Sequence, residues 1–131
     1  MSKPVLLCID DELGGLEVRK MVLESAGYSV FTAGGGKVGL EIFASQRVDL
    51  VILDYAMPEM NGYDVAVEMK RISPEIPILM YSAYSLSPQE VLRLVDAYAT
   101  KGESPARMLE LVDTLLKKTT QYSTIRNREL P

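Results

Sequence analysis

Five short apolar runs alternate along the chain with stretches in which apolar residues recur every three or four positions. A short apolar run bounded by turn residues is typical of a β-strand, and a 3.6-residue period is typical of an amphipathic helix. Three runs are almost continuously apolar, as in strands that are covered on both faces. The run from Tyr28 to Thr32 alternates, which is typical of an edge strand. The predicted strands lie at about residues 4–9, 28–32, 49–53, 77–82 and 97–100.

Helix signals fill the intervals between these runs. In the last interval one apolar stripe has helical spacing, and it consists of Met108, Leu111, Val112, Leu115 and Leu116. Ser104 and Pro105 supply an N-cap and a proline at the first helical position. The second predicted helix contains or adjoins glycines at 34–36 and 39, which cost helix stability. The predicted helices cover about residues 13–26, 37–46, 63–72, a segment that opens at 87–90, and 105–118.

The alternation of strands and helices predicts an α/β fold, a doubly wound parallel sheet with helices on both faces. With right-handed crossovers, five strands in the order 2-1-3-4-5 place the first and third strands side by side at the centre. We expect one domain over residues 1–118 and a polar, flexible tail over residues 119–131, where only Ile125 and Leu130 are apolar.

Composition and charge narrow the class of protein. The 131 residues suffice for one domain. The net charge of −4 gives no excess of basic residues that would attract nucleic acid or an anionic membrane, so neither is expected as a partner. Cys8 is the only cysteine, and no apolar run approaches the length of a membrane span, so a cytoplasmic location is expected. The absence of histidine excludes Ser-His-Asp catalysis and a phosphohistidine on this chain.

Polar side chains stand at the ends of four predicted strands. Asp10 and Asp11 follow the first strand, Asp54 the third and Lys101 the fifth, while Ser82 ends the fourth. Ligands bind outside this edge of parallel sheets. Two carboxylates 4 Å apart repel by about 4 kcal/mol at an effective dielectric near 20, so three need a compensating cation or one of them must stay protonated. Ligands that offer only oxygen favour Mg²⁺ as that cation. Each residue alone has a plain explanation as a cap, a turn residue or a solvated lysine, but together they indicate phosphoryl chemistry.

At these positions the chain resembles the receiver domain of bacterial two-component response regulators, of the chemotaxis-receiver type. The resemblance covers about residues 4–118 and implies a flavodoxin-like (βα)5 fold. It also implies a signalling phosphoacceptor that assists only its own phosphorylation and dephosphorylation, and so is not an enzyme acting on separate substrates. The matching residues are Asp10-Asp11, Asp54, Met57-Pro58, Asn61-Gly62, Ser82-Ala83, Tyr98 and Lys101.

The resemblance implies a role for each of these positions. Asp54 is the expected phosphoacceptor. The expected ligands of Mg²⁺ are Asp11 directly, Asp10 through water, a carboxylate oxygen of Asp54 and the backbone carbonyl of Ala56. The groups expected to contact the phosphoryl group are the Ser82 hydroxyl, the Ala83 backbone N–H and the Lys101 ammonium. Tyr98 is the expected switch aromatic.

The resemblance further implies signalling between partner proteins. The phosphoryl donor is expected to be a phosphohistidine on a histidine kinase or a phosphotransfer protein. Phosphorylation is expected to bias the face formed by helix 4, strand 5 and helix 5, which a downstream protein reads. We expect a stand-alone receiver, a monomer or weak dimer, because the chain ends soon after the last predicted helix.

The chain departs from the family where glycine follows the lysine. Gly102 stands where the family usually has proline, which predicts a looser loop and a less rigidly aimed Lys101. Tyr84, two residues after Ser82, brings aromatic bulk beside the phosphoryl group, so we expect water to attack the acyl phosphate slowly.

Two alternatives use the same residues. A phosphatase of the haloacid-dehalogenase type needs a second aspartate two residues after the nucleophile, whereas Asp10 and Asp11 are adjacent, and it lacks its cap domain here. A phosphorylation-independent interaction module on the same fold is disfavoured by the complete set of acids, hydroxyl and lysine, although Gly102 keeps it open.

Overall fold

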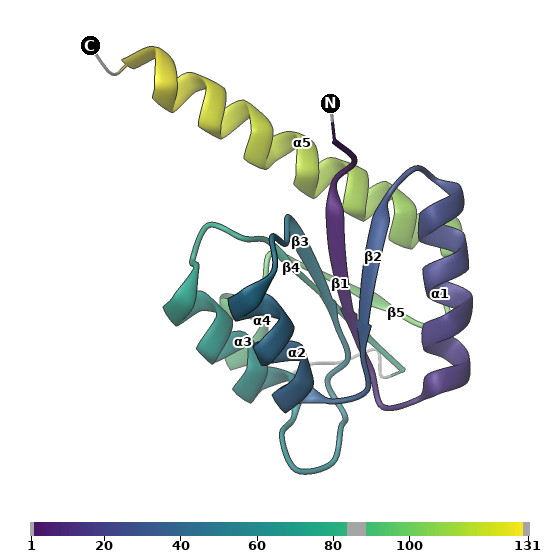
Figure 1. Cartoon of the computed structure of the whole chain (residues 1–131). Coiled ribbons are helices and arrows are strands. Elements are labelled where there is room, and N and C mark those ends of the chain that lie inside the picture. The colour runs from purple at the N-terminus through teal and green to yellow at the C-terminus, as the bar shows by residue number, and fades with distance from the viewer. Residues whose placement is uncertain (1, 84–88, 130–131) are drawn as a thin grey trace.

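The protein is described by a computed structural model over residues 2–83 and 89–129, in which a parallel sheet lies between two layers of helices (Figure 1). The sheet has five strands in the order β2-β1-β3-β4-β5, which confirms the predicted topology and the flavodoxin-like fold class. Each strand begins and ends within one residue of its predicted position. The strands are β1 (Val5–Ile9), β2 (Ser29–Ala33), β3 (Leu50–Leu53), β4 (Ile78–Ser82) and β5 (Ala97–Thr100).

Helices cover both faces of the sheet, as the alternation predicts. On one face lie α1 (Leu13–Ser25) and α5 (Pro105–Glu129), and on the other lie α2 (Gly36–Ser45), α3 (Gly62–Ile72) and α4 (Gln89–Leu94) (Figure 1). The edge strand β2 alternates between exposed and half-buried positions before its buried last residue, as its sequence pattern predicts. The predicted start of α4 at residues 87 and 88 lies outside the described residues.

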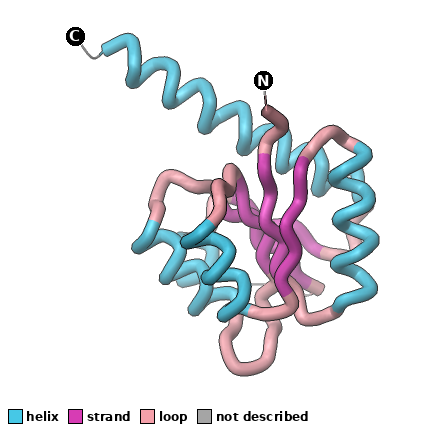
Figure 2. Tube along the Cα trace, in the orientation of Figure 1, coloured by secondary structure: helices cyan, strands magenta, loops and turns pink. Residues whose placement is uncertain are grey.

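The last helix is longer than the sequence pattern predicts. It continues through residue 118 to Glu129 and projects past the sheet (Figure 2). Most of the predicted tail is therefore helical, while its flexibility stays a prediction. Within the two described ranges, none of the helices has the combination of length and apolar character that crossing a membrane requires.

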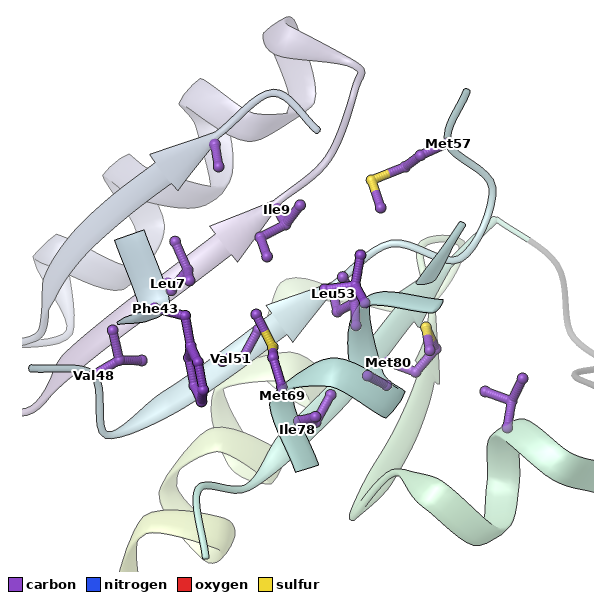
Figure 3. Close-up of a cluster of buried hydrophobic side chains, with 14 residues drawn as sticks. Leu7, Ile9, Phe43, Val48, Val51, Leu53, Met57, Met69, Ile78 and Met80 are labelled. Carbon is purple, nitrogen blue, oxygen red and sulfur yellow. The ribbon is translucent and has the colours of Figure 1, made fainter. Parts of the chain in front are cut away.

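Two separate apolar clusters hold the layers together. Alternate strand residues such as Leu7 and Ile9 face α2 and α3 (Figure 3), while Leu6 and Cys8 face α1 and α5. Burial of this apolar surface is the main favourable contribution to folding. Cys8 has no exposed surface, and burial of its thiol raises the pKa to about 12. It is a packing residue and a poor nucleophile at neutral pH.

The strand register places the acids side by side. Ile9 pairs with Leu53 in the two central strands, so the residue after each strand stands at the same edge. The Asp54 N–H donates to the Ile9 carbonyl at 3.0 Å, and the Asp10 N–H donates to the Ala33 carbonyl at 3.1 Å. These bonds carry the sheet one step past the ends of β1 and β3, which gives both aspartates a rigid backbone.

Close packing accounts for two of the glycines that weaken the prediction of α2, Gly36 and Gly39. A Cβ atom at Gly39 would collide with the side chain of Ile9, so the glycine lets α2 pack directly on β1. Gly62 has the same role at the start of α3, where a Cβ would stand 2.5 Å from the carbonyl oxygen of Asp54. The Gly62 N–H also donates to the Tyr55 carbonyl at 2.8 Å, which folds the loop back beside the phosphoacceptor candidate.

We predict opposite effects of alanine at two glycines. Gly62→Ala lowers the free energy of unfolding by about 1–3 kcal/mol, because backbone atoms must move to admit the methyl group. Gly14→Ala raises it by about 0.5–1 kcal/mol, because a Cβ there meets nothing within 4 Å and alanine favours helix α1. Urea unfolding of the two variants measures both changes. Equal effects would contradict the close approach at residue 62.

Candidate functional site

Three aspartates converge at the carboxyl edge of the sheet, and we call Asp10, Asp11 and Asp54 the acidic cluster. One carboxylate oxygen of each lies within 4.8 Å of those of the other two. Asp10 is 1% exposed and Asp54 is 6% exposed, whereas Asp11 is exposed to solvent. Two buried carboxylates this close repel strongly unless positive charges or protons compensate them.

Asp10 is held by three donors. Its Oδ1 accepts a hydrogen bond of 2.9 Å from the Glu12 backbone N–H. Its Oδ2 accepts from the Lys101 ammonium at 2.6 Å and from the guanidinium of Arg19 at 3.3 Å. The carboxylate is thus bound on both oxygens, which fixes its orientation and offsets its charge.

Lys101 joins the two buried acids. Its Nζ lies 2.6 Å from Oδ2 of Asp10 and 3.5 Å from Oδ1 of Asp54. The Lys101 backbone N–H donates to the Ser82 carbonyl at 2.8 Å, which ties the loop after β5 to the tip of β4. Among the described residues there is no cis peptide bond, and the space around Gly102 is open. The lysine therefore reaches the acids without the proline that the family usually has.

Asp54 is difficult to ionise in the metal-free protein. Burial, helped by the neighbouring negative charges of Asp10 and Asp11, raises the pKa of its carboxyl group from 3.8 to about 6, although the ammonium of Lys101 acts in the opposite direction. Of the two buried carboxylates, that of Asp54 is therefore the less compensated, because Asp10 accepts hydrogen bonds from three donors. Its environment favours any cation that approaches from the solvent side.

The other predicted site residues surround this cluster. Ser82 is 1% exposed at the end of β4, and Ala83 follows it at the surface. Ala56 is exposed two residues after Asp54. Tyr98 lies in β5, half-buried, and packs against the cluster of apolar side chains that faces α2 and α3. Tyr84 lies outside the described residues.

The structure adds one residue that the sequence reasoning missed. Arg19 of α1 is buried, and its Cζ lies 4.9 Å from the centroid of the Tyr81 ring while its Nη1 contacts Asp10. The sequence does contain a signal, because Arg19 shares the buried face of its helix with Leu16 and Leu23. A charged residue on an apolar helical stripe needs a buried partner.

The cluster suits a small divalent cation. Its three acids offer only oxygen atoms, and at least one of them, Asp11, opens to solvent, which suits an ion that keeps several water ligands. The residues that could hold Mg²⁺ are the three aspartates.

Comparison with known proteins agrees with this geometry. The family model of the response regulator receiver domain matches residues 6–113. Among curated relatives, the transcriptional regulatory protein GlrR of Escherichia coli K12 is 32% identical over 127 residues, which cover 95% of this chain and 29% of the relative. The response regulator SaeR of Staphylococcus aureus is 32% identical over 120 residues, which cover 89% of this chain and 52% of the relative. The chain thus spans about half or less of the length of these relatives.

Solved structures give the same result. A CheY-like receiver domain protein from Methanospirillum hungatei has a TM-score of 0.87 at 25% identity, covering 92% of this chain and 99% of its own. The response regulator TrrA of Thermotoga maritima, solved in complex with Mg²⁺–BeF, has a TM-score of 0.81 at 33% identity, covering 86% and 98%. The family match spans most of the chain, and the chain belongs to the response regulator receiver domain family of two-component signalling.

Proposed function

We propose that Asp54 accepts a phosphoryl group from a phosphohistidine on a partner kinase or phosphotransfer protein, in a reaction that depends on Mg²⁺. A carboxylate oxygen forms a bond to phosphorus while the bond from phosphorus to the donor breaks, and the leaving group keeps that electron pair. The observation that supports this proposal is the convergence of Asp54 with two further acids and the Lys101 ammonium. The reaction needs no general base, because the ionised carboxylate is already the nucleophile.

Positioning and charge compensation supply most of the catalysis in phosphoryl transfer. Mg²⁺ held by the acidic cluster and the Ala56 carbonyl would compensate charge on the transferred group and favour the ionised form of Asp54. Lys101 already lies between Asp10 and Asp54, so a modest swing of its side chain would pair it with a phosphoryl group. The proposed contacts of the other phosphoryl oxygens are the Ser82 hydroxyl and the Ala83 N–H.

The proposed signal is a change in the face formed by α4, β5 and α5. The backbone N–H of Lys101 is hydrogen-bonded to the backbone carbonyl of Ser82. A movement of either residue toward a phosphoryl group would therefore move both the end of β4 and the end of β5. Tyr98 lies in β5 three residues before Lys101 and packs at the edge of the core, where it can respond to that movement. A downstream protein would read the altered face.

The wider biological setting stays a prediction. GlrR is a transcriptional regulatory protein and is much longer than the region matched here. For this chain we propose instead the action expected from its sequence, that of a stand-alone receiver without nucleic-acid partners. The same holds for a monomeric or weakly dimeric state and for a cytoplasmic location. The haloacid-dehalogenase alternative is replaced by the family assignment.

The central prediction concerns phosphorylation at Asp54. Incubation of the full chain with acetyl phosphate and MgCl₂ adds one phosphoryl group, and Asp54→Ala abolishes the addition because the acceptor oxygen is gone. Intact-protein mass spectrometry measures both results. Asp113→Asn, which alters an exposed acid on α5, serves as a matched control and still accepts the group. Phosphorylation of Asp54→Ala, or none of the wild type, would contradict the proposal.

A second prediction follows from the raised pKa of Asp54. In EDTA at pH 8, Asp54→Asn raises the free energy of unfolding by about 1–3 kcal/mol, because the wild type must ionise a buried carboxyl whose pKa is shifted upward. This penalty is absent below the ordinary pKa of 3.8 and complete above about 6, so the gain from asparagine disappears as the pH falls from 8 to 4. Urea unfolding across this range measures it. A gain that grows toward low pH would show that the sign of the shift is wrong.

A third prediction concerns the lifetime of the phosphoryl group. Tyr84 is expected to restrict attacking water, so Tyr84→Ala shortens the half-life of the phosphorylated protein several-fold. Loss of the added mass with time, after removal of acetyl phosphate, measures the rate. A wild-type half-life of seconds would count against shielding by this tyrosine.

A further inference from the structure

Helix α1 buries a guanidinium beside the proposed metal site. Its buried positions are Leu16, Arg19 and Leu23, so a charged residue stands where its neighbours on the same face are leucines. Arg19 is only 7% exposed. A buried charge is tolerated where ion pairs and hydrogen bonds compensate it, so its partners indicate what it does.

Two contacts hold the guanidinium in one place. Its Nη1 lies 3.3 Å from Oδ2 of Asp10, and its Cζ lies 4.9 Å from the centroid of the Tyr81 ring. A planar guanidinium suits this combination of an ion pair with an aromatic face, which a lysine ammonium matches less well. Arg19 therefore acts as a fixed charge between the end of β1 and the end of β4.

Lys101 contacts the same oxygen of Asp10, but its side chain is more exposed than that of Arg19 and so has more room to move. It is 21% exposed, and it also approaches Asp54 at 3.5 Å. In the proposed reaction Lys101 turns toward the phosphoryl group, which leaves Arg19 as the cation that stays on Asp10. Among the described residues, Arg19 and Lys101 are the cations that form ion pairs with the acidic cluster, so the three acids retain one net negative charge.

We propose that Arg19 is a positioning residue that holds the Asp10 carboxylate and, through its fixed positive charge, weakens the binding of Mg²⁺ to the acidic cluster. This inference rests on the metal site of the proposed function. A divalent cation must share Asp10 with the guanidinium, and like charges repel across a partly buried site. An apolar residue at position 19 would leave two net negative charges in the metal-free protein and so favour the metal.

The test compares two side chains of similar shape, one neutral and one charged. Arg19→Met and Arg19→Lys, in the full chain at constant ionic strength, are titrated with MgCl₂ by isothermal calorimetry. We expect Arg19→Met to bind Mg²⁺ about tenfold more tightly than the wild type, and Arg19→Lys to stay within about threefold of it, because the lysine keeps the charge. Arg19→Gln replaces Arg19→Met if the methionine variant fails to fold by circular dichroism.

A matched control removes a half-buried cation elsewhere. Lys70 forms an ion pair with Asp96 at 2.8 Å and donates a hydrogen bond to the Ile76 carbonyl. This ion pair lies beside the start of β4, at the end of the strands opposite to the acidic cluster. Lys70→Met leaves the Mg²⁺ affinity unchanged. If Lys70→Met increased the Mg²⁺ affinity as much as Arg19→Met does, the increase would come from the change in net charge of the whole protein. That result would overturn the local role of Arg19.

A second readout separates charge from general stability. The rise in melting temperature between EDTA and saturating MgCl₂ is expected to be larger for Arg19→Met than for Arg19→Lys, since only the neutral variant has lost the competing cation. Equal or weaker Mg²⁺ binding by the neutral variant, with normal binding by the wild type, overturns this inference and leaves the proposed function intact. Failure of every variant to bind Mg²⁺ overturns the metal site together with the role of Arg19.

Discussion

Electrostatic repulsion among the carboxylates of Asp10, Asp11 and Asp54 is the constraint that determines which side chains surround the carboxyl ends of the strands. The sheet topology forces the problem, because β1 and β3 are neighbours and each is followed by an aspartate. The chain compensates Asp10 almost completely, with a backbone N–H, an ammonium and a guanidinium. It compensates Asp54 poorly, and this imbalance keeps one carboxyl group responsive to a cation or a phosphoryl group while the other stays fixed.

The two helical layers contribute differently to this edge. The layer of α1 and α5 supplies Arg19, whose guanidinium forms an ion pair with Asp10 and so offsets part of the negative charge of the cluster. The layer of α2 and α3 approaches the strands closely at Gly39 and Gly62, so it offers little room for movement next to Asp54. Displacement that begins at the lysine loop is therefore expected to travel through β4 and β5, which lie at the end of the strand order far from α2.

The sequence predicts the strands and their order well, because the apolar runs are short and their ends carry turn residues and aspartates. It also identifies Asp10, Asp11, Asp54 and Lys101 as neighbours, since parallel strands bring their carboxyl ends together. For Arg19 it gives only an indirect signal, the helical spacing shared with Leu16 and Leu23, and this is easily missed because an arginine in an amphipathic helix ordinarily lies on the solvated face. The packing of Arg19 against Tyr81 and its ion pair with Asp10 show that this position is buried.

The far end of α5 escapes prediction for a different physical reason. Its apolar stripe stops at Leu116, so hydrophobic periodicity gives no signal beyond that point, although the helix continues to Glu129. Periodicity reports packing against a core, whereas a projecting helix depends on local backbone preference. In the same way, Gly39 lowers the intrinsic helix propensity of α2, while the tight contact of this helix with β1 requires it.

The burial of Cys8 has a practical consequence for experiments on this protein. Its thiol is inaccessible and resists ionisation, and no other cysteine is present in the chain. A single cysteine introduced at the surface would therefore react alone with a maleimide dye or a nitroxide label in the native state. Spectroscopic probes can be attached at a chosen helix without first removing the natural thiol, which leaves the packing between β1 and its covering helices undisturbed.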